Sequence, residues 1–141
     1  MAGNTTAQKS NGTVFSQGAV VVGLLNKIKP PEKSADTIDV TTIDVVDGYK
    51  KFIAGFKDGG EVTVGGYFAF SDVGQLALDT AYEAGTEDTY TIKFPTSIGA
   101  TYTFSGIVTK YAVGEANPDD ALGFEATIKV AGKPVLAASG V

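Results

Sequence analysis

The 141-residue chain contains neither cysteine nor histidine. Their absence excludes thiolate nucleophiles, the usual zinc ligands and every catalytic triad that depends on an imidazole base. The chain also lacks the GxxxxGK[ST] phosphate loop, the GxGxxG dinucleotide pattern and the DxDxDG calcium loop. We therefore expect no catalytic residue, no metal and no cofactor.

Arginine is absent as well, because all eleven basic residues are lysines. Guanidinium groups that read guanine edges or grip phosphates in a bidentate way are therefore missing. Sixteen acidic residues bring the net charge to −5 at pH 7, and this overall charge repels polyanions. The sequence predicts no tight binding of nucleic acid, although DNA can still pass beside the protein.

Long apolar runs are missing too, since none approaches the ~20 residues of a membrane span. The N-terminal residues MAGNTTAQKSNGTVF lack the charged and then apolar arrangement of a signal peptide. We expect no membrane association, and synthesis in the cytoplasm until a larger object carries the protein out.

Two pairs of aspartates are candidates for acid and base groups: Asp44 with Asp47, and Asp119 with Asp120. Each pair lies in a turn context, where aspartate commonly accepts hydrogen bonds from the nearby backbone. The sequence therefore indicates a protein that is not an enzyme.

Glycine is abundant, with 18 copies, and threonine, valine and the aromatic residues Tyr and Phe are prominent. This composition favours an all-β chain with many turns. About seven strands and one helix predict a two-sheet β-sandwich or flattened barrel with the helix packed on one side. We expect a flexible N-terminal arm at residues 1–17 and one domain at residues 18–141.

Alternation and turn signals set the expected elements. Residues 72–84 predict the one helix, with a cap at Ser71 or Asp72 and Gly85 after its end. A bulge or bend is expected at Gly106. The expected strands are residues 18–28, 38–43, 61–70, 89–94, 101–113 and 124–130, with a final edge segment after a break at 132–134.

Residues 49–58 carry unusually many apolar side chains for a loop between two turn signals. One interpretation is a loop folded back over its own core, and the other is a docking loop that completes the core of an adjacent copy. The turn at 58–60 would separate this loop from the strand that follows. The candidate contact residues are Tyr49, Lys50, Lys51, Phe52, Ile53, Phe56 and Asp58.

The polar sides of the expected strands share small hydroxyls and mixed charges. This pattern is typical of an ordinary solvated sheet face, or it marks the inner surface of a channel. The candidate channel residues are Glu61, Thr63, Glu125 and Thr127.

The run DGYKKFIAGFKDGGEVTVGGYF, with LALDTAYEAGT, YTIKFP and YTFSGIVTKY after it, resembles the major tail tube proteins of long non-contractile bacteriophage tails. The resemblance covers residues 12–131 in order and is most distinctive over 49–66. It implies a β-sandwich whose subunits form six-membered rings, with four strands per subunit joining into one inner barrel. The rings would stack into a hollow virion tube that delivers genomic DNA to the host.

The same resemblance assigns roles to the two candidate surfaces. Residues 49–58 would contact the neighbouring ring, and residues 61–70 would form an inner-barrel strand. Further implied partners are the tape measure, tail tip and tail terminator proteins. Lys93 and Lys129 depart from an acidic channel, so they either pair with Glu61 and Glu125 or belong to the outer sheet.

A monomeric carbohydrate-binding β-sandwich is the alternative function. Its sugar-stacking groups would be tyrosines on an open aromatic platform, namely Tyr49, Tyr67, Tyr102 and Tyr111.

Overall fold

The computed structural model describes residues 11–44, 46–116, 118–119 and 121–138. Residues 1–10 of the predicted N-terminal arm and Asp120 of the second aspartate pair lie outside the described residues. The elements in chain order are β1 (Val14–Gln17), β2 (Val20–Val22), β3 (Leu25–Lys29), β4 (Ser34–Asp39), β5 (Phe52–Asp58), β6 (Glu61–Tyr67), α1 (Val73–Ala84), β7 (Asp88–Lys93), β8 (Ala100–Val113) and β9 (Gly123–Ala138).

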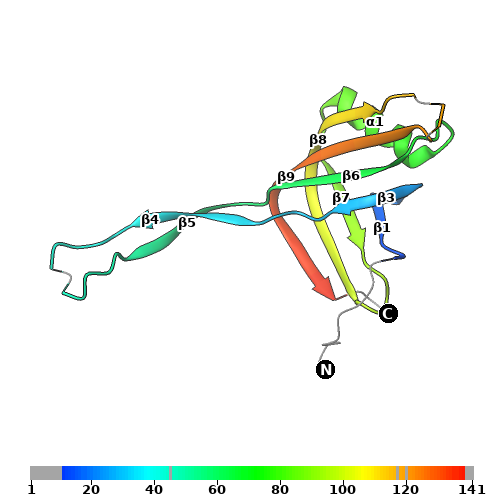
Figure 1. Cartoon of the computed structure of the whole chain (residues 1–141). Helices are drawn as coiled ribbons and strands as arrows, with labels where there is room; N and C mark the ends of the chain where they lie inside the picture. The colour runs from blue at the N-terminus through cyan, green and yellow to red at the C-terminus, as the bar shows by residue number, and fades with distance from the viewer. Residues whose placement is uncertain (1–10, 45, 117, 120, 139–141) are drawn as a thin grey trace.

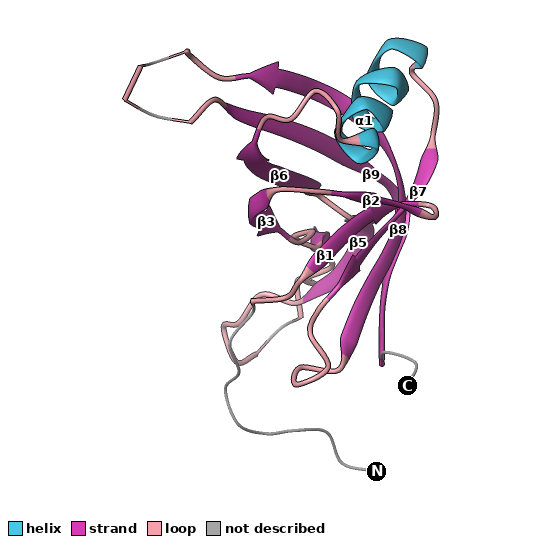
Figure 2. Cartoon of the chain, turned by 90° about the vertical axis from the view of Figure 1, so that its right-hand side faces the viewer, coloured by secondary structure: helices cyan, strands magenta, loops and turns pink. Residues whose placement is uncertain are grey.

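Seven of these strands form one antiparallel sheet in the order β2-β1-β7-β8-β9-β6-β3. The sheet curls into a half-barrel, and β4 and β5 form a separate two-stranded sheet (Figure 2). The predicted all-β, flattened-barrel fold with one helix is confirmed.

Strands β8 and β9 pass through both halves of the curled sheet (Figure 1). In one half, residues 101–106 of β8 pair with β7. In the other half, residues 123–129 of β9 pair with β6. Each long strand therefore leaves one half and enters the other, so the two halves share a single hydrogen-bonded ladder.

The bend in β8 surrounds the glycine where it was predicted. Register shifts lie between Thr103 and Ser105 and between Val108 and Lys110, on either side of Gly106. A Cβ atom at Gly106 would stand 2.7 Å from a methyl carbon of Ile128, so the neighbouring strand requires glycine there. The buried face of β8 continues through Phe104 and Val108, whereas Ile107 is exposed. The change of face therefore comes after Val108, at the second register shift.

Strand β9 continues past the predicted break at Gly132, Lys133 and Pro134. Val135 pairs with Thr103 and Ala131 with Ser105, so these three residues bulge opposite a single residue of β8. Beyond Lys129, β9 has lost its neighbour β6. A proline is tolerated there because its missing N–H lies in a bulge at a sheet edge.

The predicted single strand at 18–28 is two strands on opposite edges of the sheet. The chain turns at Gly23 and Leu24, and Leu24 has a positive φ of 59°. The Gly23 N–H donates to the Asp72 carboxylate at 3.0 Å. This contact with a residue distant in sequence fixes the turn, and the curl of the sheet makes the short crossing possible.

Helix α1 matches the prediction closely. Asp72 is the N-cap and accepts a hydrogen bond from the Gln75 N–H at 3.0 Å, and Gly85 ends the helix with φ 66°. Fully buried Gln75 hydrogen-bonds the backbone of Gly23, Tyr67 and Ala69. Gln75 thereby connects α1 to the turn between β2 and β3 and to the segment that follows β6.

The core is one cluster between the two halves of the sheet and α1. Phe15, Tyr90 and Phe104 stack in a row, with ring centroids 5.7 and 5.8 Å apart. Leu78 of α1 is fully buried in the same cluster. Because Phe15 belongs to this core, residues 14–17 of the predicted N-terminal arm are part of the folded sheet. The division of the chain into a flexible segment and one domain otherwise stays a prediction.

Candidate functional site

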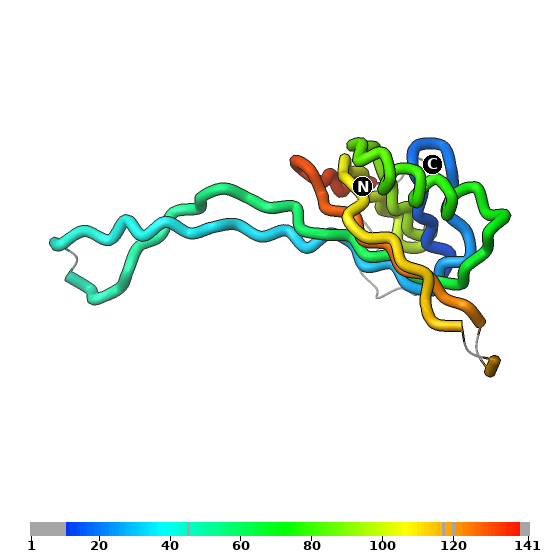
Figure 3. Tube along the Cα trace, turned by 90° about the horizontal axis from the view of Figure 1, so that it is seen from above, coloured from blue at the N-terminus to red at the C-terminus, as the bar shows by residue number. Residues whose placement is uncertain are grey.

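Strands β4 and β5 form an arm that reaches far from the body of the protein (Figures 1 and 3). We call residues 34–58 the arm. It extends the edge hairpin of β3 and β6, since β4 follows β3 and β5 leads into β6 along the chain. The predicted half-buried strand at 38–43 was wrong, because every residue of β4 (Ser34–Asp39) is exposed.

Apolar side chains stand on both faces of the arm. Ile38 pairs with Ile53, while Phe52 stands opposite Asp39 on the other face. Phe56 is 91% exposed and Phe52 51% exposed. The interpretation of this segment as a loop folded over its own core is therefore wrong, and residues 52–58 form strand β5 instead of a loop.

The tip of the arm combines local hydrogen bonds with exposed apolar groups. The Val40 N–H donates to the Lys51 carbonyl at 2.9 Å, and the Lys51 N–H donates to the Thr41 hydroxyl at 2.8 Å. Asp47 accepts from the Tyr49 N–H at 3.0 Å, and Asp44 accepts from the Thr42 hydroxyl. Both aspartates accept hydrogen bonds within their own turn, as their turn context predicted. Tyr49, Lys50 and Lys51 are all exposed.

The arm is anchored where it joins the sheet. Asp58 accepts from the Gly60 N–H at 2.8 Å and pairs with the Lys129 ammonium at 3.0 Å. The hydrogen bond from Gly60, followed by the pairing with Lys129, lowers the pKa of the Asp58 carboxyl. Gly60 has φ 80°, and a Cβ there would stand 2.3 Å from the Glu32 carbonyl oxygen. This junction accepts glycine alone.

A second surface lies on β3, β6, residues 123–129 of β9 and residues 107–113 of β8, which we call the wall. Thr63 pairs with Thr127, and Gly65 pairs with Glu125. The residues between them in sequence, such as Val64 and Ala126, are fully buried. The structure therefore brings the four predicted channel residues onto one polar face: Glu61, Thr63, Glu125 and Thr127.

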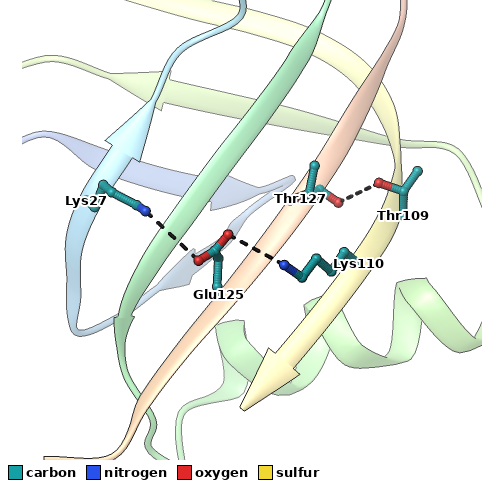
Figure 4. A network of polar contacts seen from close by, with 5 residues as sticks. All are labelled: Lys27, Thr109, Lys110, Glu125 and Thr127. Carbon is teal, nitrogen blue, oxygen red and sulfur yellow. Dashed lines mark hydrogen bonds and ion pairs between the residues drawn. The ribbon is translucent and has the colours of Figure 1, made fainter. Parts of the chain in front are cut away.

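Ion pairs cross this face. Glu125 lies between Lys27 of β3, at 4.0 Å, and Lys110 of β8, at 3.8 Å (Figure 4). The Thr109 hydroxyl donates to the Thr127 carbonyl at 3.3 Å. Sequence reasoning missed Lys27 and Lys110, because Lys27 follows an apolar run and Lys110 follows the second register shift of β8.

Lys129 and Lys93, the two lysines that do not fit an acidic channel, lie in different halves of the sheet. Lys129 stands opposite Glu61 in the register and pairs with Asp58. Lys93 belongs to β7, which is in the other half of the sheet. The wall is therefore balanced in charge instead of acidic.

The wall ends in two open edges within the described residues. On one side β3 pairs with β6 alone, and on the other side residues 107–113 of β8 lie beyond the reach of β7. The four strands alternate in direction, so β3 and β8 run opposite ways. Two copies placed side by side can therefore continue one antiparallel sheet.

The tyrosines of the alternative sugar-binding function do not form an open platform. Tyr102 packs edge-on against Phe94, and Tyr111 packs against Phe124 at 6.1 Å. Both rings lie against the core. Tyr67 ends β6, and Tyr49 lies in the connection between β4 and β5, which form a sheet separate from that of β6 and β8.

An apolar arm, a balanced polar wall and open sheet edges are features of a subunit that assembles with copies of itself. A sequence model of the family described as "Lambda phage tail tube protein, TTP" matches residues 4–137. The chain belongs to this family, and the resemblance found in the sequence is confirmed. It is therefore a structural component of a virion tail and not an enzyme.

Solved structures with the same fold include several tail and tube assemblies. A chain from the tail of an empty gene transfer agent particle, with C6 symmetry, has a TM-score of 0.77 at 16% identity and covers 94% of this chain and 100% of its own. A chain of the sheath-tube complex of the PVC extracellular contractile injection system has a TM-score of 0.75 at 14% identity, covering 95% and 93%. The SPP1 tail tube protein has a TM-score of 0.59 at 13% identity, covering 90% and 76%.

No curated protein sequence matches the chain. None of the helical segments in the described residues has the length and apolar character of a membrane crossing.

Proposed function

We propose that the chain forms hexameric rings that stack into a hollow tail tube through which genomic DNA passes to the host. The observation that carries this proposal is the wall: a four-stranded sheet with one polar face and two open edges of opposite direction. Six copies joined edge to edge would close these edges, which removes the aggregation hazard of exposed strands. The C6 symmetry of the similar gene transfer agent tail supports the number six.

In this arrangement the polar face of the wall becomes the lumen, because the opposite face is already occupied by the core. Glu61, Thr63, Glu125 and Thr127 would then line the channel. The absence of arginine and the balance of charge on the wall suit a surface along which DNA moves without being held.

The arm supplies the contact between rings. It reaches well outside the body of one subunit (Figure 3), and its apolar residues have no covering within the described part of the chain. An exposed apolar surface of this kind marks an interaction site. The residues proposed for the contact are Tyr49, Lys50, Lys51, Phe52, Ile53, Phe56 and Asp58.

The tail tip, the tail terminator and the tape measure protein are the further partners that we propose. The similar structures include a sheath/tube terminator and a tube-terminating cap, which supports partners at the ends of a tube.

Electron microscopy of the purified chain at high concentration, with and without tail tips as nuclei, tests the assembly. We expect hollow tubes with six-fold symmetry. Strictly monomeric behaviour under both conditions contradicts the proposal.

The double variant Phe52→Ser, Phe56→Ser tests the arm. Because both side chains are exposed, the circular dichroism spectrum should stay unchanged while tubes are lost in sedimentation and microscopy. Phe70→Ser is the matched control, since Phe70 is 74% exposed and lies outside the arm; this variant should still polymerise. Unfolding of the double variant, or normal tubes, would show that the arm is not the contact.

A further inference from the structure

Every lysine on the polar face of the wall has a carboxylate partner. Lys27 and Lys110 share Glu125, Lys29 pairs with Glu32 at 3.4 Å, and Lys129 pairs with Asp58 at 3.0 Å. The four lysines are thus matched to three carboxylates, and Glu61 stands opposite Lys129 as a fourth. The lysines of the wall are therefore neutralised by individual carboxylates close to them, and not only by the overall excess of acidic residues in the chain.

Glu125 differs from the other carboxylates because it faces two lysines. Lys27 comes from β3 and Lys110 from β8, on either side of the β6 and β9 pair (Figure 4). Glu125 lies in the middle of the face, whereas Asp58 and Glu32 lie at its margin, where the chain enters and leaves the arm. Loss of this one carboxylate would leave two ammonium groups of the wall without their partner.

Phosphate binding by lysine depends on ammonium groups that are free to replace counterions of the DNA. An ammonium already close to a carboxylate offers less net charge to a phosphate. We propose that Glu125 masks Lys27 and Lys110, and so keeps the wall from retaining the backbone of double-stranded DNA. This inference rests on the proposed function, because DNA meets the wall only where the wall lines a tube.

A role for Glu125 in stability is the competing explanation. Both ion pairs are solvent-exposed, with exposed side-chain fractions of 43% for Glu125 and 58% for each lysine. Exposed pairs of this kind contribute about 0–1 kcal/mol to folding. Glu125→Gln should therefore fold normally, and its effect should fall on DNA.

The test immobilises the full chain at high density on beads and measures retention of a short labelled DNA duplex at low salt. Glu125→Gln should retain DNA at least about ten-fold more than the unsubstituted chain, and its salt dependence should steepen by up to about two in the log-log slope, as two added phosphate contacts predict. Glu83→Gln is the matched control. It removes the same charge from exposed Glu83, which belongs to α1 and to none of the four strands of the wall, and should leave retention unchanged.

Two further variants complete the test. Adding Lys27→Gln and Lys110→Gln to Glu125→Gln should return retention to the original level. The pair Lys27→Gln, Lys110→Gln alone should not lower retention, because these lysines are already masked. Equal retention by Glu125→Gln and Glu83→Gln, or a loss of retention in the lysine pair alone, overturns the inference.

The bead assay does not require tubes, so it separates the two proposals. If the unsubstituted chain never forms tubes, the proposed lumen fails, whereas the comparison of Glu125→Gln with Glu83→Gln still decides whether Glu125 masks the lysines. If tubes form and the two variants retain DNA equally, the masking is wrong and the tube stands.

Discussion

At the scale of single residues, Tyr90 is the one large polar side chain of the aromatic row in the core. Its hydroxyl has no hydrogen-bond partner among the described residues. Burial, with the charge of Asp88 as a smaller cause, raises the pKa of Tyr90 to about 12. A buried and unpaired hydroxyl costs about 1–3 kcal/mol, so the protein carries an unfavourable group at its centre.

Tyr90→Phe should therefore raise the free energy of unfolding at pH 7 by about 1 kcal/mol, because the ring keeps its stacking and the unpaired hydroxyl is gone. The unfolded tyrosine ionises near pH 10 and the folded one near 12. The folded state favours the neutral hydroxyl, so this contribution to the free energy of unfolding is fully present below pH 10 and is lost as the pH rises toward 12. Tyr90→Phe should lose less stability over this range.

Denaturant unfolding at pH 7 and at pH 11 measures both effects. Tyr82→Phe is the control, since Tyr82 is 44% exposed and should change neither value. A variant Tyr90→Phe that is less stable than the unsubstituted chain would mean that the hydroxyl has a stabilising partner.

At the scale of elements, structure that depends on local sequence signals was predicted, and structure that depends on distant contacts was missed. Helix α1 was predicted because its N-cap Asp72, its apolar spacing and Gly85 are all local in sequence. The division of residues 18–28 into β2 and β3 was missed because it depends on Asp72, which lies 49 residues from Gly23. The arm was only half predicted: its apolar residues stood out, but its pairing of β4 with β5 has no burial to create an alternating pattern.

The arm should be dispensable for folding, because the core contains no residue between 34 and 58. Replacement of residues 36–56 by Asn-Gly would keep the regular pairs of Ser34 with Asp58 and Ala35 with Lys57, and would close them with a two-residue turn. We expect the thermal midpoint of the shortened chain to lie within a few degrees of the original, and we expect no tubes. A large drop in the midpoint would show that the arm stabilises its own subunit.

At the scale of the whole molecule, the polar face of the wall was predictable and its charge balance was not. Alternation in β6 and β9 placed Glu61, Thr63, Glu125 and Thr127 on one side, which the register bears out. Lys27 and Lys110 come from the two outer strands of the wall, and their meeting at Glu125 depends on strand order. Strand order is set by non-local pairing, which one sequence does not reveal.

The open edges of the wall lead to the last prediction. Joining of copies should bury the outer hydrogen-bonding groups of β3 on one copy against residues 107–113 of β8 on the next. Backbone amides that are open to water in the free subunit exchange faster than amides in a closed ladder. Hydrogen exchange should therefore slow in residues 25–29 and 107–113 when tubes form.

The edge strand β2 provides an internal reference, because it belongs to the other half of the sheet and is not part of the wall. Its amides at Val20–Val22 should change less than those of β3 when free subunits and tubes are compared by mass spectrometry. The shortened-arm chain provides a second comparison: if rings close through the wall without stacking, it should keep the added protection of β3. Equal exchange of β3 in free and assembled protein would mean that the copies do not join through the wall, whatever the arm contacts.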